Sequence, residues 1–228
     1  ADLNIKDHNY GFIMKNGSFV NNAGTNGVLG TDSVFMYSTE ATTVQNDGNL
    51  TMTGSDNIGF YMDKDSVSGT GGGIITNNGI ITGTAGNNNV GIYNYGGTID
   101  NYGNVAVGGS DLVFIDGTTD IDGENSKYAV GLYGENSAVI NRSGGIVSAG
   151  YGGYGIVAYG GTANNYGKII TNGDYSRGMY TENGVIINET GGIIDVTGES
   201  AIGMAGKGAD SKLINNGIIN VSGNNAVG

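Results

Sequence analysis

Side chains that could do acid–base or nucleophilic chemistry are scarce in this sequence. The 228 residues contain a single histidine, His8, near the N-terminal end, and no cysteine. No histidine-based triad can therefore form in the body of the chain, and cysteine-based metal or redox sites are excluded. Some proteins cleave polysaccharides with carboxylates and basic residues in a groove, but the nine Lys and Arg here are scattered. We predict a protein that is not an enzyme and holds no cofactor.

Carboxylates cluster only between residues 110 and 127, where Asp116, Asp120, Asp122 and Glu124 invite a calcium interpretation. The spacing does not fit an EF-hand loop. If Gly123 is taken as the sixth position, Thr118 is first and Ala129 is twelfth, so two obligatory carboxylates are lost. The glycine and aspartate nonapeptide of calcium-binding β-rolls is also missing. We predict no metal site.

The same segment carries an apolar run from Leu112 to Ile115 that needs cover or a partner. One interpretation is a solvated acidic loop. The other is a contact surface for a partner, formed by Leu112, Phe114, Asp116, Asp120 and Asp122.

Tyrosines are the second set of candidate residues. They end a recurring phrase of an apolar residue, Gly and a second apolar residue, as in Val90-Gly91-Ile92-Tyr93. If Ile92 and its equivalents face the core, one outward row contains Ile13, Tyr61, Tyr93, Tyr133, Val157, Tyr180 and Ala205. Such a row offers flat apolar faces with a hydroxyl at the edge, which suits sugar rings or a protein partner. Alternatively, the rings only cover the sheet by packing on one another.

The elements that position these residues follow from the repeat. The central glycines Gly131, Gly155, Gly178, Gly203 and Gly228 are 24, 23, 25 and 25 residues apart. A second phrase, Asn-x-Gly followed by a short apolar strand, begins at Asn46, Asn77, Asn101, Asn165 and Asn215, with longer forms at Asn141 and Asn188. A third apolar stretch closes each unit. Three short strands and three turns account for a unit of about 23 to 25 residues, because a strand rises ~3.3 Å per residue.

This period predicts an all-β fold, a parallel β-helix with three short strands in each coil. Apolar and polar residues alternate with period two, so that Ile92 and Val90 are expected to face inward. A leucine-rich horseshoe needs regular Leu and a helical return segment, and propeller blades are longer. In a stack of coils, like residues lie over like, so the Asn of each Asn-x-Gly should form an amide ladder. A right-handed coil follows only from the general preference of parallel crossovers.

Composition excludes several other classes. The 46 Gly indicate many turns, while Val, Ile and 14 Tyr throughout the chain argue against disorder. A net charge of -12 makes nucleic acid and anionic membrane surfaces poor partners. No apolar run approaches the ~20 residues of a membrane helix, so we expect no membrane insertion. The absence of a signal peptide, and ends that fall within the pattern, suggest a segment of a longer protein.

The whole chain, residues 1–228, is expected to be one β-helix segment with less regular coils over 1–45. Two insertions interrupt the period, at 63–73 and 110–127. They lie in adjacent coils and are expected to leave different corners. Insertions map to corners of a solenoid and often carry function, so these two are where a partner is expected.

The phrases Asn77-Asn78-Gly79-Ile80-Ile81-Thr82-Gly83 and Gly191-Gly192-Ile193-Ile194-Asp195-Val196-Thr197-Gly198 resemble the passenger repeats of large fusobacterial type V (type Va) autotransporter adhesins. The resemblance covers about residues 46–228. It implies an extracellular rod, anchored to the outer membrane by a C-terminal β-barrel translocator. It also implies binding to host cell-surface glycans, protein receptors or partner bacteria. No binding residue is carried over from the family.

Three functional hypotheses follow. The segment mediates adhesion through its insertions and tyrosine row, or it is a non-binding stalk that presents a distal tip, or it is a β-helical enzyme that degrades polysaccharides.

Overall fold

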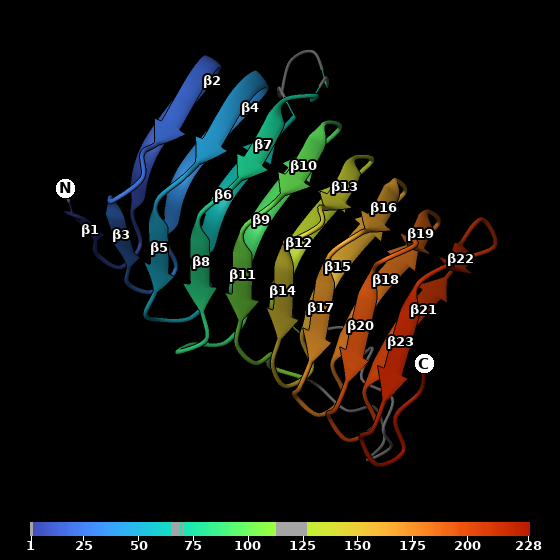
Figure 1. The fold of residues 1–228 in the computed structure, drawn as a ribbon. Helices are drawn as coiled ribbons and strands as arrows, with labels where there is room; N and C mark the ends of the chain where they lie inside the picture. The colour runs from blue at the N-terminus through green and yellow to red at the C-terminus, as the bar shows by residue number, and fades with distance from the viewer. Residues whose placement is uncertain (1, 65–68, 70, 113–126) are drawn as a thin grey trace.

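The protein is a stack of parallel β-coils, described here from a computed structural model (Figure 1). The structure describes residues 2–64, 69, 71–112 and 127–228. Residues 113–126, which include Phe114, Asp116, Asp120 and Asp122 of the predicted contact surface, lie outside this description. Every regular element within the described residues is a β-strand. The prediction of a parallel β-helix with three strands per coil is confirmed, over about eight coils.

Strands that follow the Asn-x-Gly turns form the first face of the stack, a nine-stranded parallel sheet. Its strands in spatial order are β1 (Asp2–Ile5), β3 (Asn26–Leu29), β5 (Asn49–Met52), β8 (Ile80–Gly83), β11 (Asn104–Val107), β14 (Ile146–Ala149), β17 (Lys168–Thr171), β20 (Ile193–Val196) and β23 (Ile218–Val221).

The second face contains the six-residue strands of the apolar-Gly-apolar phrase. They are β6 (Ile58–Asp63), β9 (Val90–Tyr95), β12 (Val130–Glu135), β15 (Tyr154–Tyr159), β18 (Arg177–Glu182) and β21 (Ile202–Lys207). The third face contains β7 (Ile74–Asn77), β10 (Thr98–Asn101), β13 (Ala138–Asn141), β16 (Thr162–Asn165), β19 (Val185–Asn188) and β22 (Lys212–Asn215).

Near the N-terminal end, two long strands run through both the second and third faces. These are β2 (Tyr10–Asn21) and β4 (Val34–Asn46), and they join the two faces into one 14-stranded sheet. β4 pairs with β6 through Val34–Thr39 and with β7 through Thr43–Asn46. β2 pairs with β4 through Tyr10–Asn21, with a register shift between Lys15 and Gly17.

The predicted amide ladder is present at the corner between the third and first faces. Each Asn Nδ2 donates to the Asn Oδ1 of the next coil, at 2.7 to 2.9 Å. The ladder contains Asn21, Asn46, Asn77, Asn101, Asn141, Asn165, Asn188 and Asn215. Because a buried amide without a partner is costly, this ladder fixes the alignment of the coils.

The central glycines of β6, β9, β12, β15 and β18 form a column in which an added side chain would clash with its surroundings. A Cβ on Gly91 would lie 2.6 Å from the Gly131 carbonyl oxygen and 2.6 Å from Val105 Cγ1. Gly131 and Gly155 meet the same kind of obstruction from the next glycine of the column. These glycines are required because the backbone of the next coil approaches closely.

The glycine column also corrects one expectation. Gly91 and Ile92 both face the interior, so the alternation slips by one residue and Val90 lies on the outer side, packed with Val130, Tyr154 and Val157. The period-two rule failed here because two consecutive residues of the strand, Gly91 and Ile92, are buried.

Candidate binding face

The outer side of β6, β9, β12, β15 and β18 carries the predicted tyrosine row. The strand register aligns Ile13, Tyr37, Tyr61, Tyr93, Tyr133, Val157, Tyr180 and Ala205 in one column. The alignment of the seven residues expected in this row is therefore confirmed. We call this set the tyrosine column.

Tyr37 belongs to the tyrosine column but was missed in the sequence, because Phe35 replaces the glycine that marks the phrase. Its distance of 24 residues from both Ile13 and Tyr61 was the signal that could have found it.

Rings of the tyrosine column contact one another edge to face. The ring centroids are 5.2 Å apart for Tyr37 and Tyr61, 4.8 Å for Tyr61 and Tyr93, and 5.2 Å for Tyr93 and Tyr133. All four are half-buried. Edge-to-face pairs at this distance stabilise a sheet by ~0.5–1.5 kcal/mol each beyond area burial. The column therefore has a structural role in covering the sheet.

Carboxylates beside the column hold two of its hydroxyl groups. Tyr93 Oη donates to Glu135 Oε2 at 2.8 Å, and Tyr61 Oη donates to Asp63 Oδ2 at 3.3 Å. Burial, followed by the negative charge of Asp63, raises the pKa of Tyr61 to about 12. Burial and the charge of Glu135 raise the pKa of Tyr133 to about 12. The phenols stay neutral at physiological pH and present hydroxyls beside fixed carboxylates.

At Val157 the column lacks a ring, and a neighbouring column supplies one. Tyr154 is 5% exposed and lies edge to face with Tyr180 at 5.3 Å and with Tyr128 at 5.1 Å. The Arg177 guanidinium lies 5.1 Å from the Tyr154 ring and donates to its hydroxyl at 2.8 Å. Aromatic cover thus continues along the face, although the residues that provide it change.

The two insertions leave from opposite edges of this face. Residues 63–73 connect the end of β6 to β7, whereas residues 110–127 connect β11 to the start of β12. At the base of the second insertion, Asp111 accepts from the Nδ2 groups of Asn87 (2.9 Å) and Asn88 (2.7 Å). These bonds, with that from Asn88 contributing most, lower the pKa of Asp111.

Leu112, the described part of the apolar run, is half-buried against the next coil. A Cβ added to Gly152 would lie 2.5 Å from Leu112 Cδ1, so this leucine covers the turn at Gly152. Its cover comes from the chain itself.

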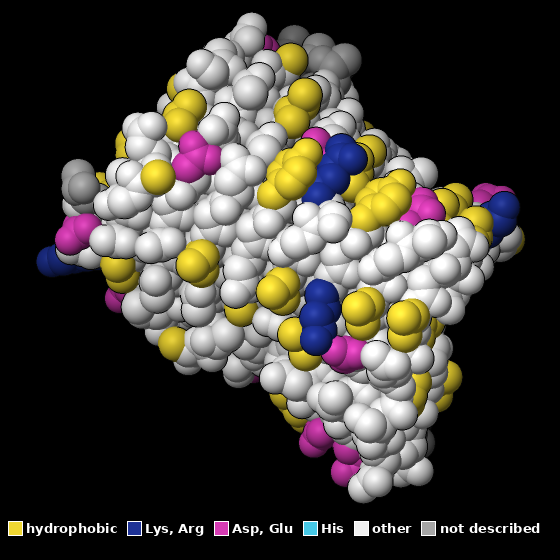
Figure 2. All heavy atoms as spheres, viewed as in Figure 1, with side chains coloured by type: hydrophobic (Ala, Val, Ile, Leu, Met, Phe, Trp, Pro, Cys, Tyr) yellow, Lys and Arg dark blue, Asp and Glu magenta, His cyan; other side chains and the backbone are white. Residues whose placement is uncertain are grey.

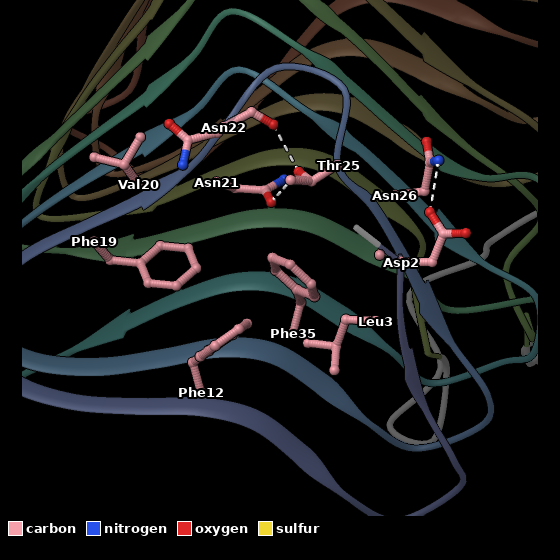
Figure 3. A pocket seen from close by; sticks show the side chains of 11 residues that line it. Asp2, Leu3, Phe12, Phe19, Val20, Asn21, Asn22, Thr25, Asn26 and Phe35 are labelled. Atoms are coloured by element: carbon pink, nitrogen blue, oxygen red, sulfur yellow. Dashed lines mark hydrogen bonds between the residues drawn. The ribbon is translucent and has the colours of Figure 1, made fainter.

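Other surfaces of the stack differ from the tyrosine face. On the side shown in Figure 2, hydrophobic side chains are scattered among polar atoms and do not gather in one patch. At the N-terminal end, Leu3, Phe12, Phe19 and Phe35 surround a hollow of about 380 Å³ that opens onto the core of the stack (Figure 3).

No arrangement for metal-dependent chemistry was found among the described residues. Within residues 2–64, 69, 71–112 and 127–228, no three His, Cys, Asp or Glu side chains are placed to hold a metal ion. The same residues contain no helix that is long and apolar enough to cross a membrane.

Residues 14–228 match a sequence family described as the BigA third pectate lyase-like domain. No curated protein and no solved structure matches the chain.

Proposed function

Because the chain belongs to the family of BigA third pectate lyase-like domains, a family of bacterial surface, adhesin-like proteins, we propose that it is an adhesive segment of a surface rod. In this proposal it is part of an autotransporter passenger, anchored at the outer membrane. Its tyrosine face binds a glycan or protein receptor on host cells, or on partner bacteria.

The observation that carries the proposal is the continuous aromatic cover on one face of an otherwise repetitive stack. Tyr61, Tyr93 and Tyr133 combine half-buried rings with hydroxyls beside Asp63 and Glu135. Aromatic side chains with a polar edge are enriched in binding interfaces because they bury large areas at a low cost in conformational entropy. Insertions at both edges of the face add surfaces that a plain rod does not need.

A set of tyrosine variants tests this proposal. Replacing Tyr93, Tyr133 and Tyr180 with Ala should weaken binding to target cells by about tenfold or more, which corresponds to ~1.4 kcal/mol. The matched control replaces Tyr102, Tyr151 and Tyr166, which are 48%, 41% and 39% exposed on other parts of the surface. Circular dichroism and thermal melting establish that both triple variants are folded.

Deletion of residues 110–125 separates the contribution of the second insertion. If both the tyrosine variant and the deletion bind cells as well as the unchanged protein does, the segment is a stalk. New reducing or unsaturated ends after incubation with polysaccharides would instead favour the β-helical enzyme.

A further inference from the structure

A groove lies beside the tyrosine column, at the corner where the second face begins. Its volume is about 290 Å³, and it is lined by residues of three successive coils: His8, Asn9, Tyr10, Asp32, Ser33, Val34, Asp56, Ile58 and Tyr61. We propose that this groove is a binding site for an uncharged hexose unit of a glycan. This proposal names a ligand class for the proposed adhesion. It rests on the proposed function only in taking a glycan as the ligand.

The floor and one end of the groove are apolar. Val34 and Ile58 are half-buried, and they occupy the outward column that Tyr154 fills further along the stack. Tyr10 stands at the end of the groove with 57% of its surface exposed, and its ring contacts Tyr37 edge to face at 5.9 Å. An exposed phenol ring beside an apolar floor fits the C–H face of a pyranose.

Hydrogen-bond acceptors line the opposite wall. His8, Asp32 and Asp56 occupy equivalent turn positions with positive φ of 59°, 50° and 59°, a conformation in which Asn, Asp and His are enriched. Asp32 Oδ2 contacts His8 Nδ1 at 2.9 Å, and Asp56 Oδ1 contacts Lys127 Nζ at 3.1 Å. Among the described residues, none donates a hydrogen bond to Asp32 Oδ1 or to Asp56 Oδ2. These two oxygens can accept hydrogen bonds from sugar hydroxyls, and carboxylate acceptors form short, strong bonds of this kind.

Charge decides against an acidic sugar. The Lys127 ammonium is already paired with Asp56, whose Oδ1 it contacts at 3.1 Å. A uronate would meet the carboxylates of Asp32 and Asp56, and no lysine or arginine is among the described residues that line the groove. The net charge of -12 adds to this repulsion. A neutral hexose has no such penalty.

The groove is open only over the first coils. Further along the same column Val130 is 7% exposed, and the buried Tyr154 contacts Tyr128 and Tyr180. These rings fill the position that is open above Val34 and Ile58. The site is therefore local to coils that contain Tyr10, Asp32 and Asp56.

Calorimetric titration of the purified chain with neutral hexamers of glucose and mannose, and with a galacturonate hexamer, tests the site. At least one neutral hexamer should bind, and galacturonate should bind at least tenfold more weakly. Tyr10→Ala, and separately Asp32→Asn with Asp56→Asn, should each weaken neutral binding tenfold or more, whereas Tyr10→Phe should retain it because the ring is kept. Tyrosine fluorescence gives a second readout, because the chain has no Trp.

Matched controls are Tyr151→Ala, which removes another exposed ring, and Asp210→Asn, which removes another exposed carboxylate. Both should change binding less than twofold. The proposal is overturned if no neutral hexamer binds, if the groove variants bind as the controls do, or if galacturonate binds more tightly. The proposed adhesion can survive this failure, since Tyr93, Tyr133 and Tyr180 lie outside the groove and are tested on cells.

Discussion

In the coil of Phe35 and Gly27, a large and a small residue have changed places relative to the later coils. Phe35 occupies the position of the central glycines, and its ring is 2% exposed. Gly27 lies in a column that contains Leu50, Ile81 and Val105 in later coils. A Cβ on Gly27 would be 2.5 Å from Phe35 Cε2, so the missing side chain makes room for the ring. Core volume is thus conserved within the coil although two repeat positions are broken.

A double-mutant cycle tests this compensation. Phe35→Gly alone should destabilise the protein by ~3–5 kcal/mol through the cavity it leaves. Gly27→Leu alone should cost ~1–3 kcal/mol through overpacking. The double variant restores the residue pattern of the later coils. Its loss of unfolding free energy, measured in urea, should therefore be smaller than the sum of the two single losses by ~1 kcal/mol or more.

The distant substitution Ile186→Ala, combined with Gly27→Leu, provides the control and should show additive losses. Additive losses for Phe35→Gly with Gly27→Leu would contradict the exchange of volume.

At the scale of elements, strands of the second face are held by side-chain columns that cross the coils. The tyrosine column adds ring contacts between successive strands on the outer side, while the glycine column lets the backbones approach on the inner side. Because the rings are half-buried and lie near carboxylates, ionising them in the folded state is unfavourable. The stability of this face should therefore decrease at alkaline pH.

The folded pKa of Tyr61 and of Tyr133, about 12, lies above the ordinary value of 10. Their contribution to stability should be fully present below pH 10 and lost as pH rises through 12, since the unfolded chain releases these protons first. The urea midpoint, measured from pH 9 to pH 12, should therefore decrease as the pH rises from 10 to 12.

Replacing both Tyr61 and Tyr133 with Phe should reduce the slope, because Phe keeps the ring and has no proton to release. An unchanged slope in this double variant would assign the alkaline loss to other groups.

The whole molecule behaves as a one-dimensional stack, since each coil contacts mainly its neighbours. The register continues from β15 to β18 with Tyr154 opposite Arg177, and Arg177 N donates to Gly153 O as each strand start does in the stack. One coil can therefore be removed, because the residue before it and the first residue after it are already placed to continue the same pairing.

Deleting residues 154–176, one full coil, should leave a folded β-helix, because Gly153 then leads into β18 as Ser176 does now. Far-ultraviolet circular dichroism should keep its β signal, and the urea transition should stay cooperative at a lower midpoint. Deleting only 154–165 shifts the following strands onto the wrong faces. This shorter deletion should abolish the cooperative transition, and equal stability of the two variants would argue against independent coils.

The sequence by itself determined the period, the three strands per coil, the amide ladder and the alignment of the tyrosine row. It could do so because stacked coils place like residues over like, so a repeat in the chain becomes a column in space. Tertiary structure alone decided the outward position of Val90, the pairing of Phe35 with Gly27 and the groove beside Tyr10. These features depend on a one-residue slip at the central glycine and on contacts between different columns in neighbouring coils, and neither leaves a periodic mark in the sequence.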